Sequence, residues 1–396
     1  MSTTPSTPAP GSQGIADRVM AGWSLFWFTP ADASLLGVIR ICIGLLVLYV
    51  HLVYSLDVQA YFGEHAWIDL PIVNAQRLEE EQPAPTLDWW EPEYDEENEF
   101  APPPTVRKGH AVWSLWFHVT DPAAIERIYL VMLGVMVLFT LGLWTRVTAV
   151  LTWLAFLSCV HRVPQLVYGM DIVIGIVLFY LMLGPCGAAL SLDRLLANLR
   201  ARRSNPTVEI RAVHSAGANF CLRLMQVHLA FIYLISGLCK LQGPAWWNGT
   251  AVWNTIINYE LSLVRYPWYA DALRSLIQNR WVGELLVTAG TVYALVVEIG
   301  FPFLVWHGKL RWLMIAAAMV MHLGIAVFMG LLPFSLSMMI LVLCFIPPEQ
   351  VGPIGSWLVR AIRENAPWSR SGHAASTNVV EPVSAVGGAD QKDSVR

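Results

Sequence analysis

The sequence predicts an all-α, polytopic transmembrane helical bundle of about eight spans, with additional interfacial helices. Of its 396 residues, 56% are hydrophobic and only 14% are charged, whereas soluble domains carry about 25% charged residues. The mean hydropathy is +0.51. Eight segments approach the roughly 20 apolar residues that a helix needs to cross a bilayer. We therefore expect a multi-pass integral membrane protein, in the inner membrane if the source is a bacterium, with membrane lipid as its surroundings.

Three regions follow from composition along the chain. Residues 1–14 are rich in Ser, Thr and Pro and are expected to be disordered. They lack the charged region followed by an apolar core that marks a signal peptide. Residues 15–348 form the predicted membrane domain, and 349–396 a largely disordered cytoplasmic tail. Within the domain, Ile15 to Phe28 mixes Arg18 with several aromatic residues, which is typical of a helix lying in the membrane interface.

The eight predicted spans are defined by apolar runs between polar segments. They cover 34–56, 124–144, 146–163, 170–188, 218–240, 282–306, 311–330 and 332–347. The last one is short for a full span.

Basic residues in the short segments between spans predict the orientation, because cytoplasmic loops carry an excess of Lys and Arg. Threading eight spans places all the basic segments on one side, which favours an N-in, C-in topology. These segments contribute Arg146, then Arg194, Arg200, Arg202, Arg203 and Arg211, then Lys309 and Arg311, and finally Arg360, Arg363 and Arg370.

The opposite side receives the acidic segment 57–120. Its centre, LEEEQPAPTLDWWEPEYDEENEF, lacks the alternating Asp/Asn pattern and the Gly of a calcium loop. We therefore expect a solvated acidic loop rather than a cation site. The formal net charge of −4 gives no reason to expect a nucleic-acid partner.

A polar stripe on the fifth predicted span ends at a single lysine, Lys240. Residues seven apart share a helix face, so Gln226, Tyr233 and Lys240 line one stripe, with Gly237 beside it to let a helix or a ligand come close. A lysine at the end of a span can simply extend its ammonium to the interface. Burial, however, disfavours the charged ammonium, and a neutral amine could accept a proton. Both interpretations stay open on the residues alone.

Three further polar residues lie within or at the ends of predicted spans. His161 is either an interfacial polar residue or a partner of Lys240 at the same membrane face. Glu298 precedes Pro302 by four residues, so the proline ring should disturb the helix near the Glu298 carbonyl; its carboxyl either bonds freed backbone or serves a site. His322 lies near the middle of its span, where a polar residue normally faces the bundle interior or a cavity.

Other chemistry finds little support in the sequence. The cysteines form no CxxC pair, so neither a zinc site nor a disulfide framework is indicated. No nucleophile elbow, zinc-protease motif or phosphate-binding loop occurs in a suitable context. The spans show no clear inverted repeat, which weakens a transporter interpretation. The tryptophans at 246 and 247 are typical of membrane interfaces, although a ring-shaped ligand could stack on them.

The stretch from Tyr233 to Trp253, YLISGLCKLQGPAWWNGTAVW, resembles the HTTM domain, the membrane part shared by vitamin K-dependent gamma-carboxylases and many bacterial proteins. Further pieces fit the same pattern in the same order. They are SLLGVIRICIGLL, HRVPQLVYGMD, LGPCGAALSLDRL and MHLGIAVFMGLLPFSLSMM, and together they extend from about Ala33 to Pro348. The most specific piece is Gly237-x-x-Lys240 followed by Trp247-x-Gly249.

The resemblance implies a carbon–carbon lyase that deprotonates reduced vitamin K or a related quinol, with O2 and CO2 as co-substrates and no metal. It implies that Lys240 is the catalytic base and that His161 assists at the quinone oxygen. We expect a substrate site lined by Tyr233, Gly237, Trp247, Glu298 and His322. The acceptor would be a glutamate-bearing peptide or protein on the extracytoplasmic side.

Animal carboxylases continue into a large lumenal domain, whereas few residues follow Pro348 here. We therefore do not expect processive carboxylation of a propeptide-bearing substrate. The alternative to the enzyme is a non-enzymatic scaffold that binds a quinone or lipid without the chemistry.

Overall fold

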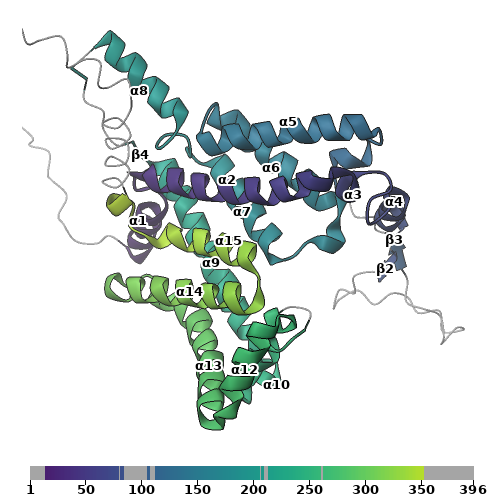
Figure 1. Cartoon of the computed structure of the whole chain (residues 1–396). Coiled ribbons are helices and arrows are strands. Elements are labelled where there is room, and N and C mark those ends of the chain that lie inside the picture. The colour runs from purple at the N-terminus through teal and green to yellow at the C-terminus, as the bar shows by residue number, and fades with distance from the viewer. Residues whose placement is uncertain are drawn as a thin grey trace, which may run out of the picture. The chain divides into compact units, whose positions relative to one another are not determined.

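The computed structural model confirms the all-α class (Figure 1). The structure describes residues 14–79, 81–83, 105–107, 112–205, 207–208, 213–259 and 262–351. Within these ranges the regular secondary structure is helical apart from two short strand pairs, β1 (Ala31–Asp32) with β4 (His214–Ser215) and β2 (Glu81–Pro83) with β3 (Thr105–Arg107). The predicted disorder of residues 1–13 and of the tail, and the centre of the acidic loop, fall outside the described residues.

Five helical segments are long and apolar enough to cross a membrane, which supports the multi-pass prediction. The first joins α2 (Ser34–Tyr54) to α3 (Val58–Phe62) through the turn Ser55–Asp57. The other four are α5 (Pro122–Leu141), α9 (Ala216–Lys240), α13 (Arg280–Leu304) and α14 (Gly308–Met329).

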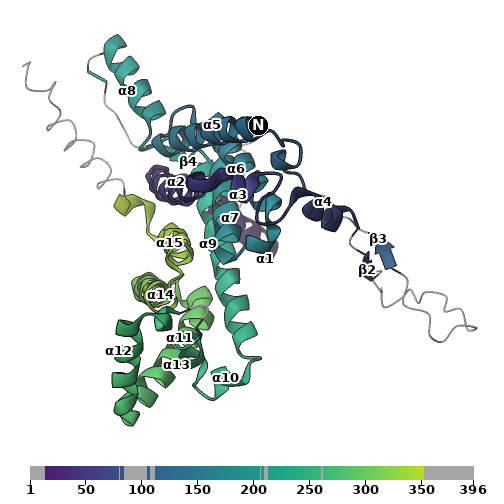
Figure 2. The ribbon, with the colours of Figure 1, turned by 45° about the vertical axis from the view of Figure 1, so that its right-hand side comes forward.

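The remaining three predicted spans form helices that do not meet the same standard. Two are short and apolar, α7 (Gly169–Leu183) and α15 (Leu332–Val342), the latter extended by the turn Leu343–Phe345. The third, α6 (Thr145–Arg162), carries two arginines and a histidine. In both views α9 and α13 run across the direction of α2 and α5 (Figures 1 and 2). The exact number of eight spans and the N-in, C-in topology therefore stay predictions.

Short helices occupy segments that were expected to be loops. The segment 57–120 contains α3, α4 (Leu70–Glu79), the β2–β3 pair and the turn Leu115–Phe117. The basic linker after α7 contains α8 (Leu192–Ser204). Between α9 and α13 lie α10 (Pro244–Trp247), α11 (Ala251–Ile256), the turn Leu263–Arg265 and α12 (Pro267–Gln278). The turn Leu115–Phe117 precedes α5. A second turn, Pro164–Leu166, separates α6 from α7.

The predicted interfacial helix forms as α1 (Ile15–Phe28) and is attached to α9. The carbonyl of Phe26, in the last turn of α1, accepts hydrogen bonds from Asn219 (2.9 Å) and Arg223 (3.2 Å). The Arg223 guanidinium also lies 4.4 Å from the centre of the Phe26 ring. Because Trp23 stays 60% exposed, α1 keeps an apolar surface for lipid while its end is held to the bundle.

The main core is formed by apolar faces of α2, α7, α9 and α15 together with parts of α5, α6, α13 and α14. The packing of α2 on α5 depends on Gly44. A Cβ at this position would meet the Oγ1 of Thr140 and lie 3.2 Å from the Thr140 Cα. Small residues allow transmembrane helices to approach closely, so Gly44 is required for this helix contact.

We predict that Gly44→Ala destabilises the protein. The added methyl group would push against Thr140 of α5, and overpacking of this kind typically costs about 1–3 kcal/mol. The matched control is Gly134→Ala on α5, where a Cβ would meet nothing within 4 Å and where alanine is the better helix former. Thermal unfolding in detergent should therefore give a lower midpoint for Gly44→Ala than for Gly134→Ala. Equal midpoints would contradict the close contact of α2 with α5.

Candidate functional site

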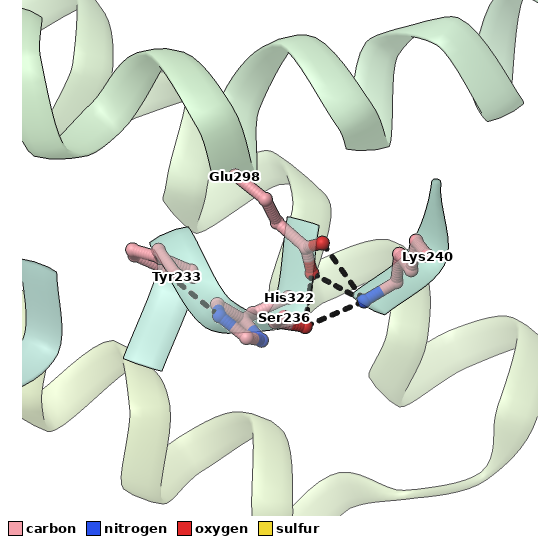
Figure 3. Close-up of polar contacts among 5 residues, drawn as sticks. All are labelled: Tyr233, Ser236, Lys240, Glu298 and His322. Carbon is pink, nitrogen blue, oxygen red and sulfur yellow. Dashed lines mark hydrogen bonds and ion pairs between the residues drawn. The ribbon is translucent and has the colours of Figure 1, made fainter. Parts of the chain in front are cut away.

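Lys240, the last residue of α9, forms an ion pair with Glu298 of α13 (Figure 3). Its Nζ lies 2.8 Å from each of the two carboxylate oxygens and 2.6 Å from the Oγ of Ser236. Ser236 in turn donates to the Glu298 Oε1 at 3.2 Å. The Lys240 side chain is 26% exposed and that of Glu298 only 9%. The cluster thus has a buried acidic side and an ammonium that a ligand can reach.

The two carboxylate oxygens of Glu298 differ in their contacts. Oε1 accepts hydrogen bonds from Lys240 and Ser236, whereas the buried Oε2 lies at ion-pair distance from Lys240 without the geometry of a hydrogen bond. Pro302 lies in the last turn of α13. The hydrogen-bond and ion-pair partners of the Glu298 carboxylate thus lie on α9.

Gly237 is the reason that α9 and α13 come close enough for this pair. A Cβ at Gly237 would lie 2.7 Å from the Cγ1 of Ile299 and 3.3 Å from the Cβ of Glu298. A larger residue would separate the two helices at the level of the carboxylate. Gly237 was expected to let a helix or a ligand come close. In the structure it is helix α13 that comes close, and this brings Glu298 to Lys240.

A second polar pair lies deeper on the same side of α9 (Figure 3). The hydroxyl of Tyr233 is 2.8 Å from the Nε2 of His322 on α14, and both residues are almost completely buried. The Nδ1 of His322 is buried without a partner. Tyr233 precedes Lys240 by seven residues, which corresponds to about 10 Å along the helix axis. Gln226, another seven residues earlier, is also buried and donates to the carbonyl of Cys344.

Two of the predicted site residues, His161 and Trp247, make contacts other than with the Lys240 side chain. His161, at the end of α6, is half-buried, and its Nδ1 lies 2.7 Å from the carbonyl oxygen of Trp113. Within the described ranges, no hydrogen bond or ion pair joins it to the Lys240 cluster. Trp247 is 72% exposed and donates its indole N–H to the Leu241 carbonyl at 2.7 Å.

Two residues of the cluster were not among the predicted site residues. The ring of Trp246, rather than that of Trp247, lies 5.4 Å from the Nζ of Lys240, within the range of a cation–π contact. Ser236 was not considered at all, although it precedes Lys240 by four residues. Helical spacing alone places such a residue next to the lysine on the same face.

Two cavities in the described part of the chain lie near α6 and α7, and Lys240 lines neither of them. One, of about 30 Å³, has His51, Tyr54 and Asp171 in its wall. The other, of about 410 Å³, extends to His228 of α9. The predicted outward-facing pocket around Lys240 therefore stays a prediction. Among the residues described, no group of three or more potential ligands is arranged to hold a metal ion.

Comparisons with protein-family models, with curated proteins and with solved structures find no match to this chain. The function is therefore inferred from the residues and contacts of the chain itself.

We predict that Lys240→Met destabilises the protein more than the double variant Lys240→Met/Glu298→Gln. The single change leaves a buried carboxylate without its counter-charge. Breaking a fully buried pair in this way costs about 3–5 kcal/mol, and less is expected here because Lys240 keeps 26% of its side chain exposed. In the double variant a neutral amide can still accept a hydrogen bond from Ser236.

Thermal unfolding in one detergent would measure the difference. Lys309→Met, at an exposed position, removes the same charge elsewhere and should leave the midpoint unchanged. A double variant no more stable than the single one would show that the carboxylate does not depend on Lys240.

Proposed function

We propose that this chain is a vitamin K-dependent gamma-carboxylase-like membrane enzyme in which the Lys240–Glu298 pair accepts a proton from a quinol. The observation that supports it most directly is a charge pair that is buried on one side and reachable on the other: Lys240 keeps 26% of its side chain exposed and Glu298 only 9%. Intramembrane ionisable residues are costly and typically mark a functional site.

The pair is suited to holding a proton next to a developing negative charge. On the sequence alone, Lys240 could be a neutral amine because burial disfavours its charged form. In the structure a carboxylate, that of Glu298, lies 2.8 Å from its Nζ. An ammonium and a carboxylate in contact carry no net charge together, so they tolerate an apolar environment better than either ion alone. When the pair takes up one more proton it becomes positive, and this charge would stabilise an adjacent oxyanion.

We assign separate tasks to the members of the cluster. Glu298, through Oε2, which makes no hydrogen bond, offers an acceptor site for the proton. Lys240 passes the proton or faces the oxyanion, Ser236 orients both, and the Trp246 ring offers an apolar surface beside the ammonium. In this proposal the quinol supplies, with O2, the strong base that removes the gamma proton of a glutamate before CO2 is added.

The histidines have weaker support. His161 lies against Trp113 and would act at the quinone oxygen only if a ligand spans the distance to Lys240. His322 holds Tyr233 beneath the cluster and is proposed to position the face of α9. Gly237 and Trp247 remain proposed binding residues, the first through the helix contact and the second through its exposed ring.

The alternative is a membrane scaffold that binds a quinone or another lipid without turnover. The observation that favours it is the cavity of about 410 Å³ among α6, α7 and α9, which lies away from the charge pair. In that case the Lys240–Glu298 pair would serve only to join α9 to α13.

We predict that purified protein in nanodiscs, given reduced vitamin K and O2, forms the quinone epoxide, detected by mass spectrometry. Glu298→Gln should lower the rate at least about 100-fold, the lower range for loss of a general base. Lys240→Arg should do the same, because arginine keeps the charge but does not release its proton. Ser236→Ala should have a smaller effect, and Lys309→Met none.

The double variant Lys240→Met/Glu298→Gln serves as a folded, inactive control. Activity in Lys240→Arg equal to that of the parent would exclude lysine as a proton carrier. A folded parent that binds the quinone, as judged by its unfolding temperature, but forms no epoxide would favour the scaffold instead.

A further inference from the structure

A cavity of about 410 Å³ lies among α6, α7 and α9. Its volume falls within the range of small-molecule sites, roughly 300–1,000 Å³. Along α7 its wall extends from Asp171 to Tyr180, nine residues or about 14 Å. Between these ends the lining is apolar, formed by Trp153, Phe156, Leu157, Ile172, Ile176 and Phe179. Gly175, also in the wall, leaves room where other residues would place a side chain.

One polar pair interrupts this apolar lining. The hydroxyl of Tyr180 on α7 lies 2.8 Å from the Nδ1 of His228 on α9. If the tyrosine donates, the Nε2 of the histidine carries a proton; if the histidine donates, the tyrosine keeps its own. In either arrangement the pair retains one N–H or O–H donor, and neither side chain makes another hydrogen bond within the described part of the chain. An acceptor oxygen in the cavity would satisfy that donor.

The depth of the pair restricts what such an acceptor can be. His228 is twelve residues from each end of α9 (Ala216–Lys240), so it lies at the middle of a helix long enough to span the membrane. Placing a charged headgroup at this level is costly. A neutral oxygen, such as that of a carbonyl group, avoids this cost.

We propose that the cavity binds an uncharged, lipid-soluble carbonyl compound. Its hydrocarbon body would fill the space between α6 and α7, and its carbonyl oxygen would accept a hydrogen bond from the Tyr180–His228 pair. This site is independent of the proposed enzyme activity, because Lys240 lies about 18 Å farther along α9. It differs from general lipid contact by its hollowed wall, which is open on one side, and by the donor of the Tyr180–His228 pair.

The probe for this site is a long-chain methyl ketone that carries a diazirine and a terminal alkyne. After irradiation of the full chain in nanodiscs, labelled peptides are identified by mass spectrometry. Labelling is expected in α6 and α7, on residues between Trp153 and Tyr180. The unlabelled ketone should compete about 3- to 10-fold better than the alkane of equal length, the difference expected for one hydrogen bond.

The matched variants are Gly175→Leu and Gly134→Leu. The first adds a side chain to the cavity wall, with its Cβ in ordinary contact with Phe156 at 3.6 Å; the second adds the same side chain where nothing lies within 4 Å. Only Gly175→Leu should abolish labelling. Ile172→Trp fills the cavity from a position that is 59% exposed and serves as a second blocking variant if Gly175→Leu unfolds.

Because either residue alone keeps a donor, the double variant Tyr180→Phe/His228→Leu tests the polar pair. It should retain labelling but lose the preference for ketone over alkane, whereas Tyr180→Phe alone and His228→Leu alone should each keep a preference. Labelling of both leucine variants to the same extent, or equal competition by alkane and ketone in the parent, would overturn the proposal. Lys240→Met/Glu298→Gln should label like the parent, so failure of the enzyme proposal and failure of this one are distinguishable.

Discussion

The arrangement of the candidate site depends on one requirement, that a lysine at the end of an apolar helix has a counter-charge within reach. The partner, Glu298, is itself almost completely buried, so each ion would be costly without the other. The pair forms because Gly237 allows α13 to lie against α9 at the level of Ile299. The ion pair therefore depends on the close packing of α9 against α13. Any change that separates the two helices by the width of a methyl group also separates the charges.

Buried guanidinium groups also need partners, and in two places these are backbone carbonyls rather than a counter-charge. Arg40 of α2 donates to the carbonyls of Cys186 and Leu190 in the segment that follows α7. Arg162 at the end of α6 donates to the carbonyls of Gly63 and Ile68. Both arginines are fully buried. Because hydrocarbon offers no hydrogen bonds, each of these groups attaches a helix to a connecting segment and so restricts how the connection can lie.

The sequence predicts part of this arrangement, and the limits have physical causes. Seven-residue spacing correctly places Gln226 and Tyr233 on one buried stripe that leads to Lys240. Composition correctly predicts an all-α chain with helices that are long and apolar enough to cross a membrane. The pairing of Lys240 with Glu298 was not predicted, because 58 residues and several short helices separate them and only tertiary packing joins α9 to α13. The number of spans stays open for a related reason: α7 and α15 are apolar but short, and hydropathy alone does not show how a short helix is accommodated.

The aromatic residue beside Lys240 could not be predicted from the sequence. Trp246 and Trp247 are adjacent, and composition treats them alike, yet only Trp246 lies beside the ammonium while Trp247 points to the exterior. Successive residues of a helix lie about 100° apart, so two neighbours face different surroundings. The turn between α9 and α10 decides which of them faces Lys240, and that geometry is not encoded in a pattern of residue types.

Helix α9 contributes residues to both the cavity and the charge pair, and the two sites stay separate. His228 contacts α7, Tyr233 contacts α14 and Lys240 contacts α13. At about 100° per residue, Tyr233 and Lys240 fall on nearly the same face, whereas His228 is turned by about 140° from Tyr233. The cavity beside His228 and the charge pair at Lys240 therefore lie on different faces and at different depths of one helix. A ligand in the cavity would affect the charge pair only by moving α9 as a whole, and the close contact at Gly237 opposes such movement.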